Sequence, residues 1–322
     1  MSRPLLSVVV VADGEEAVAE LLEHLRRQTA ADRVETVLVG PRGALGASRR
    51  DGSLAVRVVE VEGVVPLSEA RARGVRAAGA PWVVVGETHA FPEPAWAAAL
   101  IDACQAGATV AVPVIESGNG GLISWSNFVL SYAPWSKPSA RGLARIPEQT
   151  AVVPREQLLA FGEELPWRLE TGSGFGEALL RRGARPTLVT AARLRHLNVS
   201  SPRAWLPERF AGGRVYGATR SRPWSIQRRL LHVVAAPLGA AVFLFRAVRT
   251  AAALSCWPER RLLAVPALAL GVAAWVAGET LAYLAGAGGA EEDMAEYEIN
   301  RRRYLARGPD VPAGASRRSS ST

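Results

Sequence analysis

The sequence predicts an α/β fold built on an open, mostly parallel sheet that helices flank. Two observations predict it. Short apolar runs rich in valine recur through the first half of the chain, as expected for strands that are covered on both faces. Segments with one apolar face separate these runs and are typical of helices. Ligands of such sheets bind beyond the carboxyl ends of the strands, so candidate residues are sought there.

The elements follow one another from the N-terminus. A strand at Leu5–Val11 precedes a helix that carries Val18, Leu21 and Leu25 on one face. The segment 117–147 is expected to be irregular, either a surface segment packed by its own aromatics or an acceptor loop. Further strands are expected at Val34–Val39, Val56–Val61, Trp82–Val85, Thr109–Pro113, Val152-Val153 and Thr187–Thr190, and further helices at Ser68–Ala78, Ala95–Ala106 and Glu177–Arg182.

Composition excludes several classes of protein. The chain has 322 residues, 49% of them hydrophobic, which excludes a disordered protein. Its two cysteines, Cys104 and Cys256, exclude a disulfide scaffold, and no Cys/His spacing fits a structural zinc module. The net charge of +8 comes almost wholly from arginine and would suit phosphates or anionic lipids. No helix combines dense basic residues with aromatics, so we expect no nucleic-acid partner.

Two long apolar stretches, Leu230–Phe245 and Leu262–Gly278, follow the sheet. A spanning hairpin would put the arginine-rich loop between them outside the cell, against the positive-inside tendency, so in-plane or re-entrant attachment to a membrane surface is favoured. The alternative is a buried helical hairpin in a soluble protein. We therefore divide the chain into a sheet domain at 1–220, a membrane-associated helical region at 221–290 and a polar, disordered tail at 291–322.

Four motifs appear in a familiar order. Ser7–Val11 is followed by a helix that ends in Gln28-Thr29, and Ala70–Gly74 reads Ala-Arg-Ala-Arg-Gly. Gly86–His89 precedes a Pro-x-Pro-x-Trp run, and Glu170-Thr171 lies ahead of a short helix. Over residues 5–220 the chain resembles the family 2 glycosyltransferases, which implies a GT-A-like, Rossmann-type mixed sheet flanked by helices, with the apolar helical region appended.

The resemblance implies a function as well as a fold. It implies an inverting transfer of a sugar from a nucleotide-diphosphosugar to a glycan or lipid-linked acceptor at the cytoplasmic face of the cell membrane. It also implies a divalent cation, Mn²⁺ or Mg²⁺, on the donor diphosphate. The chain departs from the family at two places. Gly40 stands where members carry an aspartate for the nucleobase, and the Asp-x-Asp position offers only Glu87 and His89.

Metal ligands are sought first at that position. Glu87 and His89 are two residues apart at a strand end, and in extended geometry they would point to one side. His196, at a later strand end, could be a third ligand, as the resemblance implies for some members. A carboxylate with imidazoles suits Mn²⁺ better than Mg²⁺. The alternatives are a hydrogen-bonded turn histidine at 89 and a satisfied core histidine at 196.

The remaining candidates bind donor or acceptor. Glu170 is the candidate catalytic base, with Glu177 as its rival and a solvated helix-end glutamate as the alternative. Arg71 could contact the diphosphate, although an exposed helix arginine has the same pattern. Arg214 could close over the diphosphate or bind lipid phosphate near the membrane. Asp13 and Glu15 could meet the base or ribose, or could cap the first helix.

Three functions remain open. The first is the membrane-associated glycosyltransferase. The second is a catalytically inactive GT-A-like binding or scaffold protein, which the absent aspartates suggest. The third is a soluble transferase for another nucleotide-linked group. Metal-dependent nucleotide binding that requires Glu87 would separate the first and third from the second.

Overall fold

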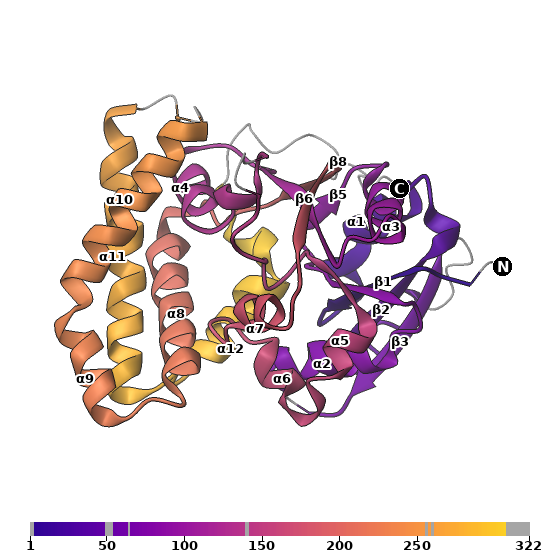
Figure 1. Cartoon of the computed structure of the whole chain (residues 1–322), viewed down its shortest axis with the longest axis horizontal. Coiled ribbons are helices and arrows are strands. Elements are labelled where there is room, and N and C mark those ends of the chain that lie inside the picture. Colours follow the sequence, from indigo (N-terminus) through magenta and orange to yellow (C-terminus); the bar gives the residue numbers. More distant parts are fainter. Residues whose placement is uncertain are drawn as a thin grey trace, which may run out of the picture.

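The computed structural model describes residues 3–48, 54–63, 65–138, 142–254, 257–258 and 261–306. A mixed sheet lies at one side of the molecule and a bundle of long helices at the other (Figure 1). The strands are β1 (Leu6–Val11), β2 (Val34–Pro41), β3 (Ala55–Val61), β4 (Trp82–Val85), β5 (Ala90–Pro92), β6 (Val110–Ser117), β7 (Val152–Pro154) and β8 (Pro186–His196).

The sheet order is β3-β2-β1-β4-β7-β6-β8-β5. The β1–β2, β1–β4, β2–β3 and β6–β8 pairs are parallel, while β7 and β5 join antiparallel to their neighbours. The predicted mixed, mostly parallel sheet flanked by helices is confirmed. The helices of this part are α1 (Glu15–Arg26), α2 (Leu67–Ala77), α3 (Trp96–Gln105), α4 (Leu122–Ser131), α5 (Arg155–Leu159), α6 (Leu165–Arg168) and α7 (Phe175–Arg181), with 3-10 turns η1 (Ala31–Arg33), η3 (Ala133–Trp135) and η4 (Gly162–Glu164).

Alternate residues of β1 build two separate cores. Val8 and Val10 pack with residues of α1 and α3, whereas Val9 packs with α2 on the other face. Both sets are almost completely buried. The continuous valine run therefore reflects a strand covered on both faces. Gly74 brings α2 close to the sheet, because a Cβ there would overlap the side chain of Val9.

Long helices follow the sheet: α8 (Pro202–Ser221), α9 (Ile226–Val234), α10 (Ala236–Leu254) and α11 (Arg261–Ala285). By length and composition α10 and α11 could each cross a membrane. Their outer surface is apolar, with Leu238 69% and Leu262 93% exposed. Water does not favour so many exposed apolar side chains, and such a patch marks an interaction surface. The two predicted apolar helices are thus present and largely uncovered.

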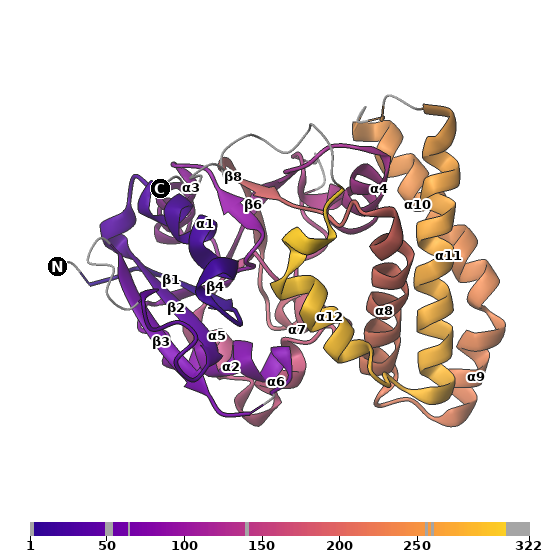
Figure 2. The same cartoon turned by 180° about the vertical axis from the view of Figure 1, so that it is seen from behind.

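The chain then returns to the sheet. Helix α12 (Ala290–Ile299) and the 3-10 turn η5 (Arg301–Tyr304) run from α11 back toward α1 and the end of β4 (Figure 2). Asn300 Nδ2 donates to Asp13 Oδ2 at 2.9 Å, and Arg302 forms an ion pair with Glu20. We expected residues 291–322 to form a disordered tail. Residues 290–306 instead form α12, which packs on α8, and η5, which reaches the sheet domain, and 307–322 lie outside the described residues.

Three local expectations differ from the structure. Residues 122–131 of the segment expected to be irregular form α4, because its apolar residues pack against α11 and α10. Residues 86–89 form a turn between β4 and β5 rather than an extended strand end. The strand expected at 187–190 extends to His196, since β6 pairs in parallel with residues 186–189 and, after a register shift, with residues 193–196.

Close packing around Gly40 accounts for a glycine at the position where the resemblance leads us to expect an aspartate. A Cβ on Gly40 would overlap the carbonyl oxygen of Ala12 and lie 2.8 Å from Leu45 Cδ1. Any side chain there must displace the backbone that follows β1. We expect Gly40→Ala to lower the free energy of unfolding by ~1–3 kcal/mol, as overpacking does. Gly46→Ala, where the nearest atom is 3.7 Å away, is the matched control in denaturant unfolding. Equal stability of the two variants would contradict this account.

Candidate active site

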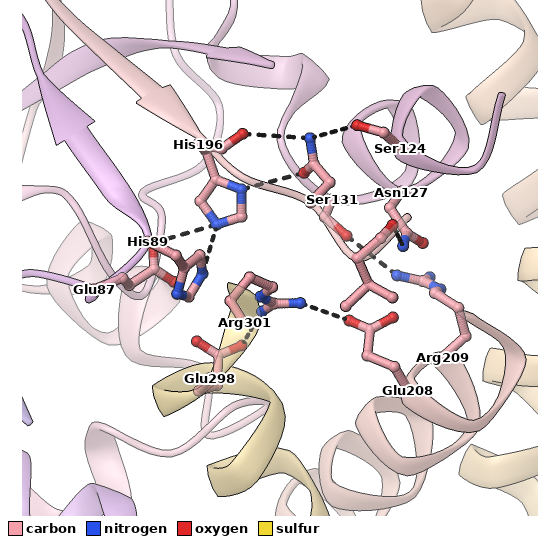
Figure 3. A network of polar contacts seen from close by, with 12 residues as sticks. Glu87, His89, Ser124, Asn127, Ser131, His196, Glu208, Arg209, Glu298 and Arg301 are labelled. Carbon is pink, nitrogen blue, oxygen red and sulfur yellow. Dashed lines mark hydrogen bonds and ion pairs between the residues drawn. The ribbon is translucent and has the colours of Figure 1, made fainter. Parts of the chain in front are cut away.

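Three buried side chains meet at the carboxyl end of β4. Glu87 and His89 belong to the turn after this strand, and His196 ends β8. The short antiparallel pairing of β5 with β8 sets Ala90 opposite His196, and the Leu197 N–H donates to the His89 carbonyl at 3.0 Å. Sheet register therefore joins two parts of the chain that are 107 residues apart (Figure 3).

The three side chains have the spacing of metal ligands. The Nε2 atoms of His89 and His196 are 3.1 Å apart, and His196 Nε2 is 3.5 Å from Glu87 Oε2. Ligands about 2.1 Å from one ion lie about 3.0–3.5 Å from each other. Glu87 Oε2 is buried without a hydrogen-bond partner among the described residues. These residues fit a divalent cation, and two imidazoles with one carboxylate favour a transition metal over Mg²⁺.

Asn198 orients His196. Its Nδ2 donates to Ser117 Oγ at 3.0 Å, so its Oδ1 faces His196 Nδ1 at 3.1 Å. Nδ1 must then carry the proton, which leaves the Nε2 lone pair directed toward Glu87 and His89. Asn119 holds Asn198 in turn, because its Nδ2 and Oδ1 bond the Asn198 carbonyl and N–H. The histidine is thus held in the tautomer that can bind a metal.

Burial sets the charges of the cluster. Burial, helped by the nearby Glu298 carboxylate and opposed by the Arg301 cation, raises the pKa of Glu87 to about 8. Burial, with Arg301 next in effect, lowers the pKa values of His89 and His196 well below the ordinary range. At neutral pH both imidazoles are therefore neutral, and Glu87 carries a proton that a metal would displace.

This protonation predicts a pH dependence of metal binding. A carboxylate binds metal only as the anion, so a cation must displace the Glu87 proton below its raised pKa. We expect Mn²⁺ affinity to rise about tenfold per pH unit between about pH 6.5 and 7.5 and to level off above about pH 8. Calorimetry in buffers of different ionisation enthalpy should detect release of about one proton at pH 7. Equal affinity at pH 6.5 and 8.5 would contradict this protonation state.

Arg301 and Glu298 reach the cluster from the returning C-terminal segment. Arg301 is 4% exposed, and its two Nη atoms lie 2.8 Å from Glu298 Oε1 and 3.4 Å from Glu208 Oε1. On its other side Glu298 Oε2 is 3.9 Å from Arg71 Nη2. The Glu298 carboxylate therefore lies between two arginines beside the candidate metal ligands. Figure 3 shows its pairing with Arg301. Neither Arg301 nor Glu298 was a candidate from the sequence, because both fell in the expected tail.

A central cavity of about 370 Å³ adjoins this cluster. His196, Arg71, Arg301 and Glu298 line it together with Glu170. The candidate base thus shares this cavity with His196, the one candidate metal ligand that lines it among the described residues. Its Oε1 accepts the N–H of Thr171 at 2.9 Å. The rival Glu177 also lines the cavity and is exposed.

Glu148 is a cavity residue that sequence reasoning missed. Its Oε1 accepts the Gly172 N–H at 3.0 Å, which ties its loop to the loop that carries Glu170. Burial raises the pKa of Glu148 to about 7, and the adjacent Glu170 carboxylate adds to the rise. An acid poised near neutrality is suited to proton transfer. Glu148 sits in an aperiodic loop, so no sequence pattern marks it.

Of the other residues predicted to contact the donor, one lines the central cavity and two are bonded to protein groups elsewhere. Arg71 is 5% exposed and lines the central cavity, so the exposed-helix alternative is wrong. Asp13 bonds Asn300 and does not cap α1, whose N-terminal cap is Gly14. Glu15 accepts the N–H groups of Ala47 and Ser48, at 2.8 and 3.0 Å, and the Ser48 hydroxyl.

Arg214 lies away from these residues. Its Nε donates to the Gly286 carbonyl at 3.0 Å, at the junction of α11 and α12. It does not line the central cavity. His196, Arg71 and Glu170 therefore line one cavity, and Glu87 and His89 contact His196 without lining it. Asp13, Glu15 and Arg214 do not line this cavity.

Comparison with known proteins gives a fold. No protein-family model matches the chain, and no curated protein matches its sequence. Among solved structures, the mannosyltransferase PcManGT from Pyrobaculum calidifontis, in complex with GDP-Man and Mn²⁺, is 17% identical with a TM-score of 0.53, over 87% of this chain and 88% of that one. S. aureus TarS (residues 1–349) in complex with UDP is 15% identical with a TM-score of 0.42, over 88% and 92%. The likeness to PcManGT and the sheet topology together give this chain a GT-A-like glycosyltransferase fold.

Proposed function

We propose that this protein is a metal-dependent glycosyltransferase that takes its sugar from a nucleotide-diphosphosugar. One observation carries the proposal: a buried His-His-Glu cluster with metal-ligand spacing adjoins, through His196, the cavity that Arg71 and Glu170 line. The fold supports it, because the similar PcManGT was solved with GDP-Man and Mn²⁺. The acceptor is a glycan or lipid-linked molecule, and the reaction inverts the sugar.

Each residue has a separate role in the proposed reaction. Glu87, His89 and His196 would hold a divalent cation, which would neutralise charge on the donor diphosphate. Arg71 and Arg301 supply fixed positive charge to the same diphosphate. Donor binding must therefore displace the Glu298 carboxylate that lies between these arginines. We assign Asp13, at the end of β1, to the ribose, while Glu15 orders the loop after β2.

Glu170 is the proposed base. In a direct displacement, the acceptor hydroxyl oxygen bonds the anomeric carbon, its proton passes to Glu170, and the bond to the leaving diphosphate breaks. Glu148 lies beside it with a pKa of about 7, raised by burial, and can share that proton. The cavity thus holds two carboxyl groups that can exchange a proton.

We place the reaction at the cytoplasmic face of a membrane, with α9–α11 as the attachment. The exposed leucine and phenylalanine side chains of these helices support this, among them Leu231 at 64% and Phe245 at 65%. Arginines on the same helices suit an interfacial position, where the stems contact the apolar region and the guanidinium groups reach the headgroups.

Calorimetry with purified protein tests the proposed function. UDP, GDP and their sugars are titrated with and without Mn²⁺, beside a Glu170→Gln variant. We expect one nucleotide to bind only with Mn²⁺, and Glu170→Gln to keep that binding while losing transfer. Failure of every nucleotide to bind folded protein would favour the inactive scaffold. The position of Glu298 supports that alternative, because its carboxylate already occupies the space between Arg71 and Arg301.

A further inference from the structure

A second hollow lies between the long helices. This helical groove, of about 1070 Å³, is formed by α10 on one side and by α8 and α11 on the other. The end of α4 and the loop at residues 142–145 also line the groove. Its volume is at the upper limit of pockets that hold small ligands, so it can enclose an extended molecule.

The helical groove continues into the central cavity. Trp135, Arg145, Tyr216, Phe243 and Trp275 line both spaces. Tyr216 and Trp275 pack together, with ring centroids 5.6 Å apart. A molecule in the groove would therefore have one end among the apolar helices and the other at the aromatic junction that leads to Glu170.

The charge of the groove is positive. Four arginines line it, Arg145, Arg220, Arg246 and Arg249, against a single glutamate, Glu279, among the described lining residues. Glu279 is already paired, because Arg220 lies 2.9 Å from its Oε1 and Tyr283 donates to the same atom.

The other three arginines are available to a ligand. No carboxylate among the residues that the structure describes lies within ion-pair distance of Arg145, Arg246 or Arg249, although all three are exposed. Guanidinium groups bind phosphate oxygens through paired hydrogen bonds, and an apolar wall suits a hydrocarbon chain. One amphiphile satisfies both features, and a purely apolar helix of another protein would leave the arginines unpaired.

We propose that the helical groove binds the acceptor, a lipid with a long hydrocarbon chain and a phosphate head. The chain lies between α10 and α11, and Arg145, Arg246 and Arg249 hold the phosphate. A sugar hydroxyl carried beyond that phosphate enters the central cavity beside Glu170. Identifying the lipid as the acceptor rests on the proposed transferase function, whereas its binding does not. The outer face of the same helices carries exposed apolar side chains, which suits entry of a lipid from a membrane.

Direct lipid binding tests the proposal. Full-length protein in mild detergent is titrated with farnesyl phosphate and with farnesol, and binding is read by native mass spectrometry. We expect farnesyl phosphate to bind at least tenfold tighter than farnesol. The double variant Arg246→Gln/Arg249→Gln should lose that preference, whereas Arg222→Gln, an exposed arginine outside the groove, should keep it. Thermal melts confirm that each variant is folded.

Three outcomes overturn the proposal. Equal binding of farnesol and farnesyl phosphate would show that the arginines do not bind the phosphate. Equal loss in Arg222→Gln would show a diffuse charge effect. Equal binding of dioleoyl phosphatidic acid, tested in parallel, would show general contact with membrane lipid rather than an acceptor site. Metal-dependent nucleotide binding, measured on the same samples, separates these failures from failure of the transferase function.

Discussion

Glu87→Gln is expected to lower Mn²⁺ affinity by at least about 100-fold, and metal-dependent nucleotide binding should disappear with it. Removing a residue that only orients a ligand already costs about 10–100-fold, and Glu87 is proposed as a ligand itself. Metal-free stability should change little. Burial holds the pKa of Glu87 at about 8, so at pH 7 the native side chain is the neutral acid that glutamine resembles. Calorimetry with Mn²⁺ and thermal melts of the metal-free protein measure the two quantities.

Two further variants sharpen this test. Asn198→Ala should lower Mn²⁺ affinity by about 10–100-fold, because His196 would lose the acceptor that fixes its tautomer. Glu62→Gln, at an exposed ion pair with Arg42, is the matched control and should leave Mn²⁺ affinity unchanged. A Glu87→Gln protein that binds Mn²⁺ normally, or that loses stability as its main effect, would show that the cluster is structural.

Arg301→Met is expected to be the most destabilising change in the C-terminal segment. Arg301 is 4% exposed and pairs with Glu208 and Glu298, so its loss leaves two carboxylates in low-dielectric surroundings. Breaking a buried ion pair on one side costs about 3–5 kcal/mol. Stranded carboxyls have raised pKa values in the folded state, and their protonation offsets part of the cost at low pH. The loss of unfolding free energy should therefore be smaller at about pH 5 than at about pH 8.

Arg303→Met is the control on the same turn. Arg303 is 67% exposed and pairs with Glu296 at the surface, an arrangement worth less than about 1 kcal/mol. Denaturant unfolding at the two pH values compares the variants. If both arginines cost the same, the C-terminal segment is not anchored by the buried pairs, and the proposed contribution of Arg301 to the donor site loses its structural basis.

Local patterns in the sequence predicted most of the sheet. Val8, Val9 and Val10 are a continuous apolar run because both faces of β1 are covered, and a run of that kind needs no knowledge of distant residues. The motif Gln28-Thr29 helped to identify the fold because Gln28 has a structural role. Gln28 bonds the Glu93 carbonyl and the Ala97 N–H, so it joins α1 to the start of α3.

Contacts between distant segments were beyond the sequence. His89 and His196 meet through β5, a strand of only three residues that no pattern marks. Arg301 is one of three successive arginines, a composition typical of a solvated tail, and only the packing of Glu298 and Glu208 around it makes it a core residue. Glu87 and His89 were found for a partly incorrect reason, since a turn and not an extended strand brings them together.

The return of α12 to the sheet also sets the order in which the site can be completed during synthesis. Domains form from the N-terminus as the chain leaves the ribosome. A nascent chain that has reached residue 285 already contains Glu87, His89 and His196, but it lacks Arg301 and Glu298. The Thr88 hydroxyl donates to the Glu298 and Ile299 carbonyls, which are made more than 200 residues later. The candidate metal ligands can therefore come together before residues 298–301 are made, and the Arg301 side chain proposed for the donor diphosphate is added only afterwards.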